Sequence, residues 1–205
     1  MPEKNWRRFS MKRLFLIVLL PAVALGVYRW LFAPVTIRPA TASDPIRERY
    51  FGFEAEKVTI RNIAIGEGTF SHSTWLSTAF YLVEAGKVTQ LSASTVGRTP
   101  HDLGSLPWTR MKITLAIGER VTPQGTISQL GAAGHRRGGG TGGGEFTHHV
   151  SALHSQVLAG PIASGAERVV YAEGDIPISL DRHMNLERFL KKNRGNYLVV
   201  TAQMK

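Results

Sequence analysis

The residues best suited to chemistry lie in one stretch, GHRRGGGTGGGEFTHHVSALHSQ, at residues 134–156. Glycines surround a single threonine in its first half, and histidines follow in its second half. Backbone N–H groups of a glycine-rich loop bind phosphate, and imidazole nitrogens bind zinc. The candidate metal ligands are His135, Glu145, His148, His149 and His154. The spacing of these residues can therefore be tested against two kinds of site, a phosphate cradle and a metal centre.

The residues that follow the glycines do not indicate a nucleotide site. Gly138, Gly140 and Gly143 satisfy the G-x-G-x-x-G spacing, but a run of glycines meets that spacing automatically. A dinucleotide fold needs a helix directly after the loop, so that the helix N-terminus faces the pyrophosphate. Here EFTHHVS follows, which is typical of a strand, and the Lys-Ser/Thr pair of a P-loop is missing. The glycines instead predict a flexible loop at residues 131–146, because so few side chains cannot offset the entropy of ordering the chain.

The histidine spacing does not favour a metal centre either. If residues 147–158 form one strand, His148 and His149 face opposite sides of the sheet. His154 then shares a face with His148, but six residues of strand separate them by about 20 Å. A bend, or a ligand from elsewhere in the chain, would be required. The favoured interpretation is a half-exposed strand, and an exported metal-binding protein or metal-dependent enzyme is the alternative.

Other catalytic arrangements are not evident in the sequence. The chain has no cysteine, which excludes disulfides, thiolate nucleophiles and cysteine-bound metals. It has no G-x-S-x-G nucleophile elbow. Asp175 and Asp181, as the ends of one strand, would lie about 20 Å apart, too far for paired glycosidase carboxylates. We therefore expect no catalytic residues, no cofactor and no enzymatic activity.

The positive charge of the chain is concentrated at its N-terminus. The formal net charge is +10, and residues 1–38 hold seven basic residues and one acidic residue. The remaining residues carry only four surplus positive charges, mixed with acidic side chains along the sequence. A nucleic-acid-binding domain shows clustered basic residues, so no nucleic-acid partner is expected.

The N-terminal segment has the pattern of a signal anchor. An uncharged run from Leu14 to Tyr28 would measure about 22 Å as a helix, and its extension to Ala33 would measure about 30 Å. The basic residues that would hold the preceding segment in the cytoplasm are Arg7, Arg8, Lys12 and Arg13. The sequence thus predicts a cytoplasmic segment at residues 1–13 and a single transmembrane helix at residues 14–33, in contact with the lipid bilayer.

Cleavage of this segment is the alternative that stays open. Ala22-Val23-Ala24 resembles the small-residue site of a signal peptide, and Met11 could be the true start. Cleavage near Ala24 would give a secreted protein. In both cases the C-terminal part is extracytoplasmic, and periplasmic if the source is bacterial.

The rest of the chain predicts a β domain. Residues 34–50 are rich in proline and charge, which indicates a stiff linker. From residue 51 onward, short alternating segments separated by turn residues predict a mainly β domain at 51–205, a sandwich or distorted barrel with one or two short helices. Ala85-Gly86 and the segment Pro123–Gly125 predict tight hairpins. The tetrapeptide AIGE occurs at 64–67 and at 116–119, which raises the possibility of two related half-sheets.

One short helix is expected near the C-terminus of the sequence. Asn185 is a suitable N-cap, and Gly195 stands where the helix should stop. We expect this helix to pack at the edge of a sheet. Taken together, the sequence predicts a membrane-anchored extracytoplasmic β domain with a non-enzymatic binding or scaffolding role, which contacts a protein of the cell envelope. The identity of that partner and the oligomeric state stay open.

Overall fold

The computed structural model describes residues 11–43, 59–71, 74–97, 108–134, 146–181 and 183–205. They belong to two compact units, which divide between Ala33 and Pro34. The first unit contains helix α1 (Met11–Leu31), with Pro21 inside it. Among the described residues, no helix is long and apolar enough to span a bilayer. Of the basic residues expected to orient a span, Lys12 and Arg13 open α1, whereas Arg7 and Arg8 lie outside the described residues.

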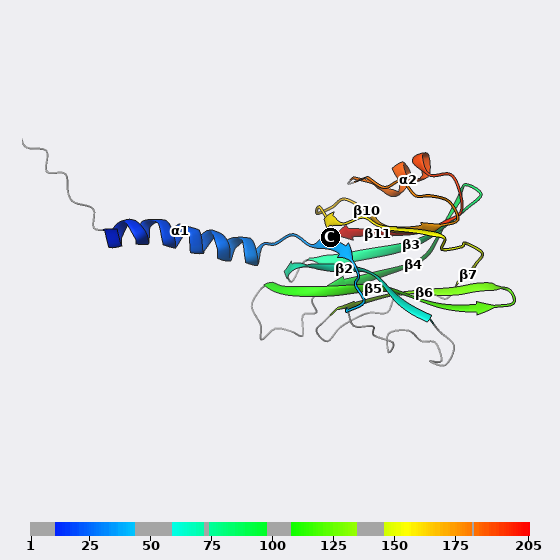
Figure 1. Cartoon of the computed structure of the whole chain (residues 1–205), viewed down its shortest axis with the longest axis horizontal. Helices are drawn as coiled ribbons and strands as arrows, with labels where there is room; N and C mark the ends of the chain where they lie inside the picture. Colours follow the sequence, from blue (N-terminus) through cyan, green and yellow to red (C-terminus); the bar gives the residue numbers. More distant parts are fainter. Residues whose placement is uncertain (1–10, 44–58, 72–73, 98–107, 135–145, 182) are drawn as a thin grey trace, which may run out of the picture. The chain divides into compact units, whose positions relative to one another are not determined.

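The second unit is mainly β, as the sequence predicts, and its strands form two antiparallel sheets (Figure 1). Sheet A has the order β7-β6-β5-β2-β1-β9, and sheet B has the order β4-β3-β11-β10-β8. The strands of sheet A are β1 (Thr36–Pro39), β2 (Thr59–Ser71), β5 (Trp108–Thr122), β6 (Gly125–Gly134), β7 (Phe146–His148) and β9 (Gly160–Pro161). The strands of sheet B are β3 (Trp75–Glu84), β4 (Lys87–Gly97), β8 (His154–Val157), β10 (Arg168–Gly174) and β11 (Tyr197–Met204).

The main hydrophobic core lies between the two sheets. Ile113 and Leu115 of β5 pack in one buried cluster with Leu76 and Phe80 of β3 and Val200 of β11. Each of these five side chains is completely or almost completely buried. Burial of one such side chain contributes about 1.5–3 kcal/mol, so the packing of the two sheets is the main source of stability.

Both predicted hairpins are confirmed. Ala85 and Gly86 connect β3 to β4 and have φ angles of 49° and 79°. These left-handed conformations match the right-handed twist of the flanking strands, which is why a two-residue loop suffices. At the other hairpin, Thr122 pairs with Gly125, and the Thr122 hydroxyl donates a hydrogen bond of 2.7 Å to the Gly125 carbonyl.

The prediction of a linker at residues 34–50 is wrong in its first part, where the chain forms strand β1. β1 pairs with β2 on one side and with β9 on the other, and Val35 and Ile37 are buried in the core. Pro39 is compatible with this role because, among the described residues, β9 pairs only with Thr36 and Ile37, so Pro39 has a strand neighbour on one side alone, like a residue of an edge strand. Residues 44–50 lie outside the described part of the chain.

The structure also places part of the predicted glycine-rich loop and both AIGE segments in strands of sheet A. Gly131 and Gly134, expected in the flexible loop, belong to β6, and residues 135–145 of that loop lie outside the described residues. The two AIGE segments lie in β2 and β5, which are paired neighbours in sheet A.

The predicted C-terminal helix is present as α2 (Leu186–Lys192), with the Asn185 side chain accepting a hydrogen bond from the Arg188 N–H. It ends before Gly195, and Gly195 has another role, because a Cβ atom there would lie 2.4 Å from Ile176 Cδ1. The expected position at a sheet edge is wrong. Phe189 packs against Tyr197 of β11 in a second buried cluster, so α2 covers the outer face of sheet B (Figure 1).

Candidate functional site

A pocket of about 670 Å³ opens where the start of β1, strand β9 and the start of β10 come together. Its apolar walls are formed by small or compact residues, namely Pro34, Ala159, Pro161, Ile162, Ala163 and Ala166. Glu167, Arg168 and His183 add polar groups. We call this hollow the Arg168 pocket. A concave apolar surface with a few polar groups is typical of ligand sites, which measure about 300–1,000 Å³.

Arg168 fixes the backbone of the pocket wall. Its side chain is buried, with 7% exposure, and its Nη1 donates to the Pro161 carbonyl at 2.6 Å. Its Nη2 donates to the carbonyls of Leu158 and Ala159 at 2.7 and 2.6 Å. Hydrogen bonds from a charged group are stronger than neutral ones, so one guanidinium holds four consecutive residues in place.

Gly160 supplies the backbone conformation of this wall. Its φ angle is +124°, a conformation that residues with a Cβ atom adopt only with strain. A Cβ atom at this position would lie 3.4 Å from Nη1 of Arg168. The turn that carries the three acceptor carbonyls therefore depends on glycine.

The other wall is tied to both sheets. Ile162 N–H donates to the Val35 carbonyl at 2.8 Å, which connects the wall to the start of β1. Gly165 N–H donates to the Met204 carbonyl at 2.8 Å, which connects it to β11. Glu167 accepts a hydrogen bond of 2.7 Å from the hydroxyl of Thr201, which also lies in β11. The pocket is thus formed in advance of any ligand.

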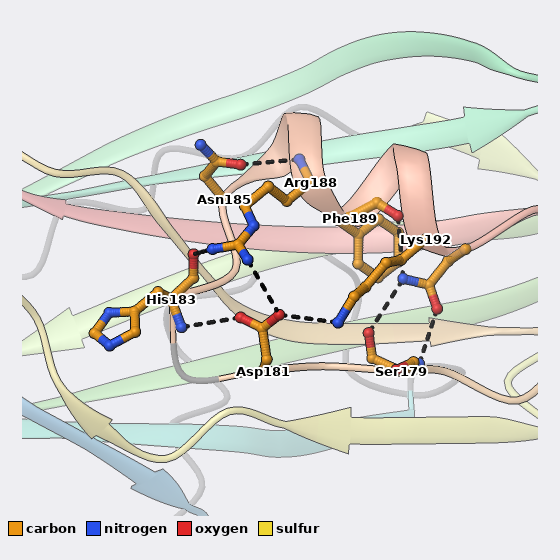
Figure 2. Close-up of polar contacts among 8 residues, drawn as sticks. Ser179, Asp181, His183, Asn185, Arg188, Phe189 and Lys192 are labelled. Atoms are coloured by element: carbon orange, nitrogen blue, oxygen red, sulfur yellow. Dashed lines mark hydrogen bonds and ion pairs between the residues drawn. The ribbon is translucent and has the colours of Figure 1, made fainter.

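His183 enters the pocket from the segment that precedes α2, and Figure 2 shows how that segment is held. The Asp181 carboxylate accepts hydrogen bonds from the His183 N–H at 3.1 Å and from Lys192 Nζ at 3.0 Å. Its hydrogen bond with Lys192, above all, holds the pKa of Asp181 below its usual value. The neighbouring Ser179 N–H donates to Asn193 Oδ1 at 2.8 Å. These contacts fasten the backbone on both sides of Asp181 to α2.

The candidate metal ligands are not brought together. His148 ends β7 in sheet A, whereas His154 begins β8 in sheet B, so the expected single strand over 147–158 is wrong. The chain changes sheets between them, with Val150 buried in the core. His149 and His154 are exposed, and His135 and Glu145 lie outside the described residues. In the part of the chain that the structure describes, no three His, Cys, Asp or Glu residues could hold a metal ion together.

His148 forms a buried pair with Ser128 that resembles a catalytic dyad in its distance alone. Nδ1 of His148 accepts a hydrogen bond from the Val150 N–H at 3.2 Å, so Nε2 carries the proton of the neutral ring. Nε2 then donates to Ser128 Oγ across 2.8 Å. Burial lowers the pKa of His148 and keeps the ring neutral. A general base must accept the serine proton at this nitrogen, so the pair is structural.

Asp175 and Asp181 also have structural roles. Asp175 follows β10 and accepts a hydrogen bond of 3.2 Å from the Asn196 N–H at the start of β11. Asp181 holds the segment before α2, as described above.

None of the residues that line the pocket is among the predicted site residues, although the sequence holds one signal for it. The strand RVVYAEG, at 168–174, has consecutive apolar residues, which indicates burial on both faces. The charged residues at the two sides of this run, Arg168 and Glu173, were therefore candidates for buried charges. No comparable signal marks Pro34 or Ala163, which join the pocket only through the pairing of β1 with β9 and the contacts of the 162–167 segment.

No family model, no curated protein and no solved structure matches this chain. Its function is therefore inferred from its own residues.

Proposed function

We propose that this protein is an exported, membrane-associated β domain that binds another component of the cell envelope without catalysing a reaction. The observation that carries this proposal is the Arg168 pocket, a hollow of about 670 Å³ whose wall is fixed by hydrogen bonds from the buried Arg168. A preformed site costs little ordering entropy when a ligand binds, which favours a binding role.

The lining of the pocket suits a compact apolar group. Its walls carry prolines, alanines and one isoleucine, and Arg168 also lines it, with its hydrogen bonds directed to backbone carbonyls. A hydrophobic side chain of a partner protein matches this chemistry, with His183 and Glu167 able to bond the partner's polar groups.

The N-terminal segment supports membrane association. Most of the large apolar side chains from Phe15 to Phe32 are exposed, and Lys12 and Arg13 precede them. Exposed apolar surface on this scale calls for a lipid or protein cover. The uncharged run Leu14–Tyr28 is short for a bilayer, so as an anchor it would place Arg29 at the interface, where its long side chain can reach water.

The pocket is tested by filling it. Both hydrophobic clusters consist of residues from 35–204, so residues 34–205 contain their own core and suit a soluble assay after a check for cooperative unfolding.

The probe is anilinonaphthalene sulfonate, whose fluorescence rises in apolar sites. Ala163→Trp should abolish saturable binding of the dye, because exposed Ala163 lines the pocket. Ala152→Trp, at an exposed alanine outside the lining, is the matched control. Equal dye binding by both variants would contradict a binding role for the pocket.

Export and anchoring are tested by the mass of the chain in its native host. An intact chain in the membrane fraction, with a domain digestible by external protease, supports the anchor. A chain that begins near residue 25 in the soluble exported fraction supports cleavage near Ala24. An intact chain in the cytoplasm would contradict the proposed location.

A further inference from the structure

Four polar side chains from both sheets meet in a cluster separate from the pocket: Arg61 of β2, Glu119 of β5, and Tyr171 and Glu173 of β10. Arg61 Nη1 donates to the Tyr171 hydroxyl oxygen at 2.6 Å, and Nη2 donates to Glu119 Oε1 at 3.1 Å. Nη2 also forms an ion pair with Glu173 Oε2, which accepts a hydrogen bond of 2.6 Å from the Tyr171 hydroxyl. This Arg61 cluster links sheet A to sheet B.

The charges of the cluster do not balance when both carboxyl groups are ionised. One guanidinium faces two carboxylates, which leaves one surplus negative charge. Glu173 is the more deeply buried acid, with a side-chain exposure of 1% against 22% for Glu119. Within the described residues, Glu173 Oε1 is buried and has no hydrogen-bond partner. An ionised oxygen in that position is unfavourable, because burial removes its water without supplying a donor.

We propose that Glu173 is a proton-binding site, and that proton uptake at this residue strengthens the contact between the two sheets in mildly acidic surroundings. The proton binds Oε1, the oxygen without a partner, and removes the surplus charge. Oε2 stays available to Tyr171 and Arg61, so its hydrogen bond with Tyr171 and its contact with Arg61 survive. Arg61 and Glu119 are left as a neutral ion pair.

The surroundings of Glu173 agree with this assignment. Burial is the largest influence and raises the pKa of Glu173, Arg61 and Tyr171 lower it, and Glu119 raises it further, with a net upward shift. The strands beside β10 place Ser155 and Leu198 opposite Glu173, and neither residue titrates. Burial also raises the pKa of Tyr171, so its hydroxyl remains a donor.

The sign of the effect on stability follows from linkage. With its pKa raised on folding, Glu173 holds a proton in the folded domain at pH values where the unfolded chain has released it. An unfolded glutamate titrates near pH 4.5. The contribution of Glu173 to stability is therefore fully present below pH 4.5 and is lost as the pH rises through the folded-state pKa.

The first test compares thermal unfolding of the full-length chain and its Glu173→Gln variant in non-ionic detergent, from about pH 8 to about pH 5. Glutamine resembles the neutral acid, so the variant keeps at high pH the stability that the wild type loses. The Tm of the variant minus that of the wild type should fall by about 2–4 °C on acidification. The difference is used because His148, whose pKa burial lowers, contributes with the opposite sign in both proteins. A difference that is constant, or that grows on acidification, would overturn the proposal.

The second test does not depend on folding of that variant. Carbon-13 NMR of wild-type protein labelled at the glutamate δ-carbons follows the Glu173 carboxyl directly. A midpoint above the ordinary glutamate value is expected, and a midpoint at or below that value refutes the assignment. Glu119→Gln should lower the midpoint, since the Glu119 charge raises the pKa of Glu173. A midpoint that this variant leaves unchanged would contradict the surplus-charge account.

Discussion

Replacement of Arg168 by methionine is the most informative perturbation of the pocket. Methionine keeps the unbranched apolar stem but removes the guanidinium, and with it the hydrogen bonds to the carbonyls of Leu158, Ala159 and Pro161. The stem can still pack, so the change isolates the polar contacts. If those contacts fix residues 158–161, both stability and dye binding in the pocket should fall together.

The size of the loss can be estimated from the three contacts. A hydrogen bond to a charged group contributes about 1.5–3 kcal/mol, but three bonds to one group are not additive. Desolvation of the buried guanidinium, with 7% exposure for the residue, offsets part of the sum. We therefore expect a loss of about 3–5 kcal/mol, comparable with the removal of one partner of a buried ion pair.

Urea unfolding of residues 34–205, followed by circular dichroism, measures this loss. Arg194→Met is the matched control, because Arg194 is exposed, and its effect should stay within about 0.5 kcal/mol. A loss below about 1 kcal/mol for Arg168→Met would refute the reasoning, since the carbonyls would then be satisfied equally well by water or by other groups.

Four further substitutions test the surroundings of the pocket and the buried histidine. Gly160→Ala should lower the free energy of unfolding in urea by about 1–3 kcal/mol, because φ at this position is +124°. Gly165→Ala should lower it by about 1–2 kcal/mol, because φ is +76° there but the surrounding space is open. His148→Gln should leave zinc binding in calorimetry unchanged, because both ring nitrogens are occupied by hydrogen bonds in the fold. Since burial lowers the pKa of His148, wild-type stability should also fall as the pH drops below 6.5, and the variant should lack this decline. Asp181→Ala should speed hydrogen exchange of the His183 amide, which loses its acceptor, without changing exchange in the core strands.

The elements predictable from the sequence are those whose signals are local. The hairpin at Ala85-Gly86 follows from two-residue spacing, and the start of α2 follows from a capping side chain at Asn185. Both depend on residues within a few positions of one another. The helix ends at Lys192, ahead of the predicted stop, and Gly195 instead leaves room for the Ile176 side chain, which spacing along a helix does not reveal.

The elements missed are those that depend on distant segments. Residues 147–158 have the composition of one strand, but β7 and β8 belong to different sheets, and no local pattern marks the change of sheet. β1 has the composition of a linker and becomes a strand because β2 and β9 pair with it. Arg61 and Glu173 are 112 positions apart, so their ion pair follows from the stacking of the sheets and from no local pattern.

The position of β11 has a consequence for how the domain is made. This strand follows the other strands of sheet B in the sequence, yet it lies in the middle of that sheet, between β3 and β10. Until Tyr197–Met204 has emerged from the ribosome, β3 and β10 have no strand to join them, and the core lacks Leu198 and Val200. Synthesis is slow compared with the collapse of a folded core, so a central strand made after the rest delays assembly of the sandwich. The two sheets of a domain built in this order can close over their common core only after this central strand has been made.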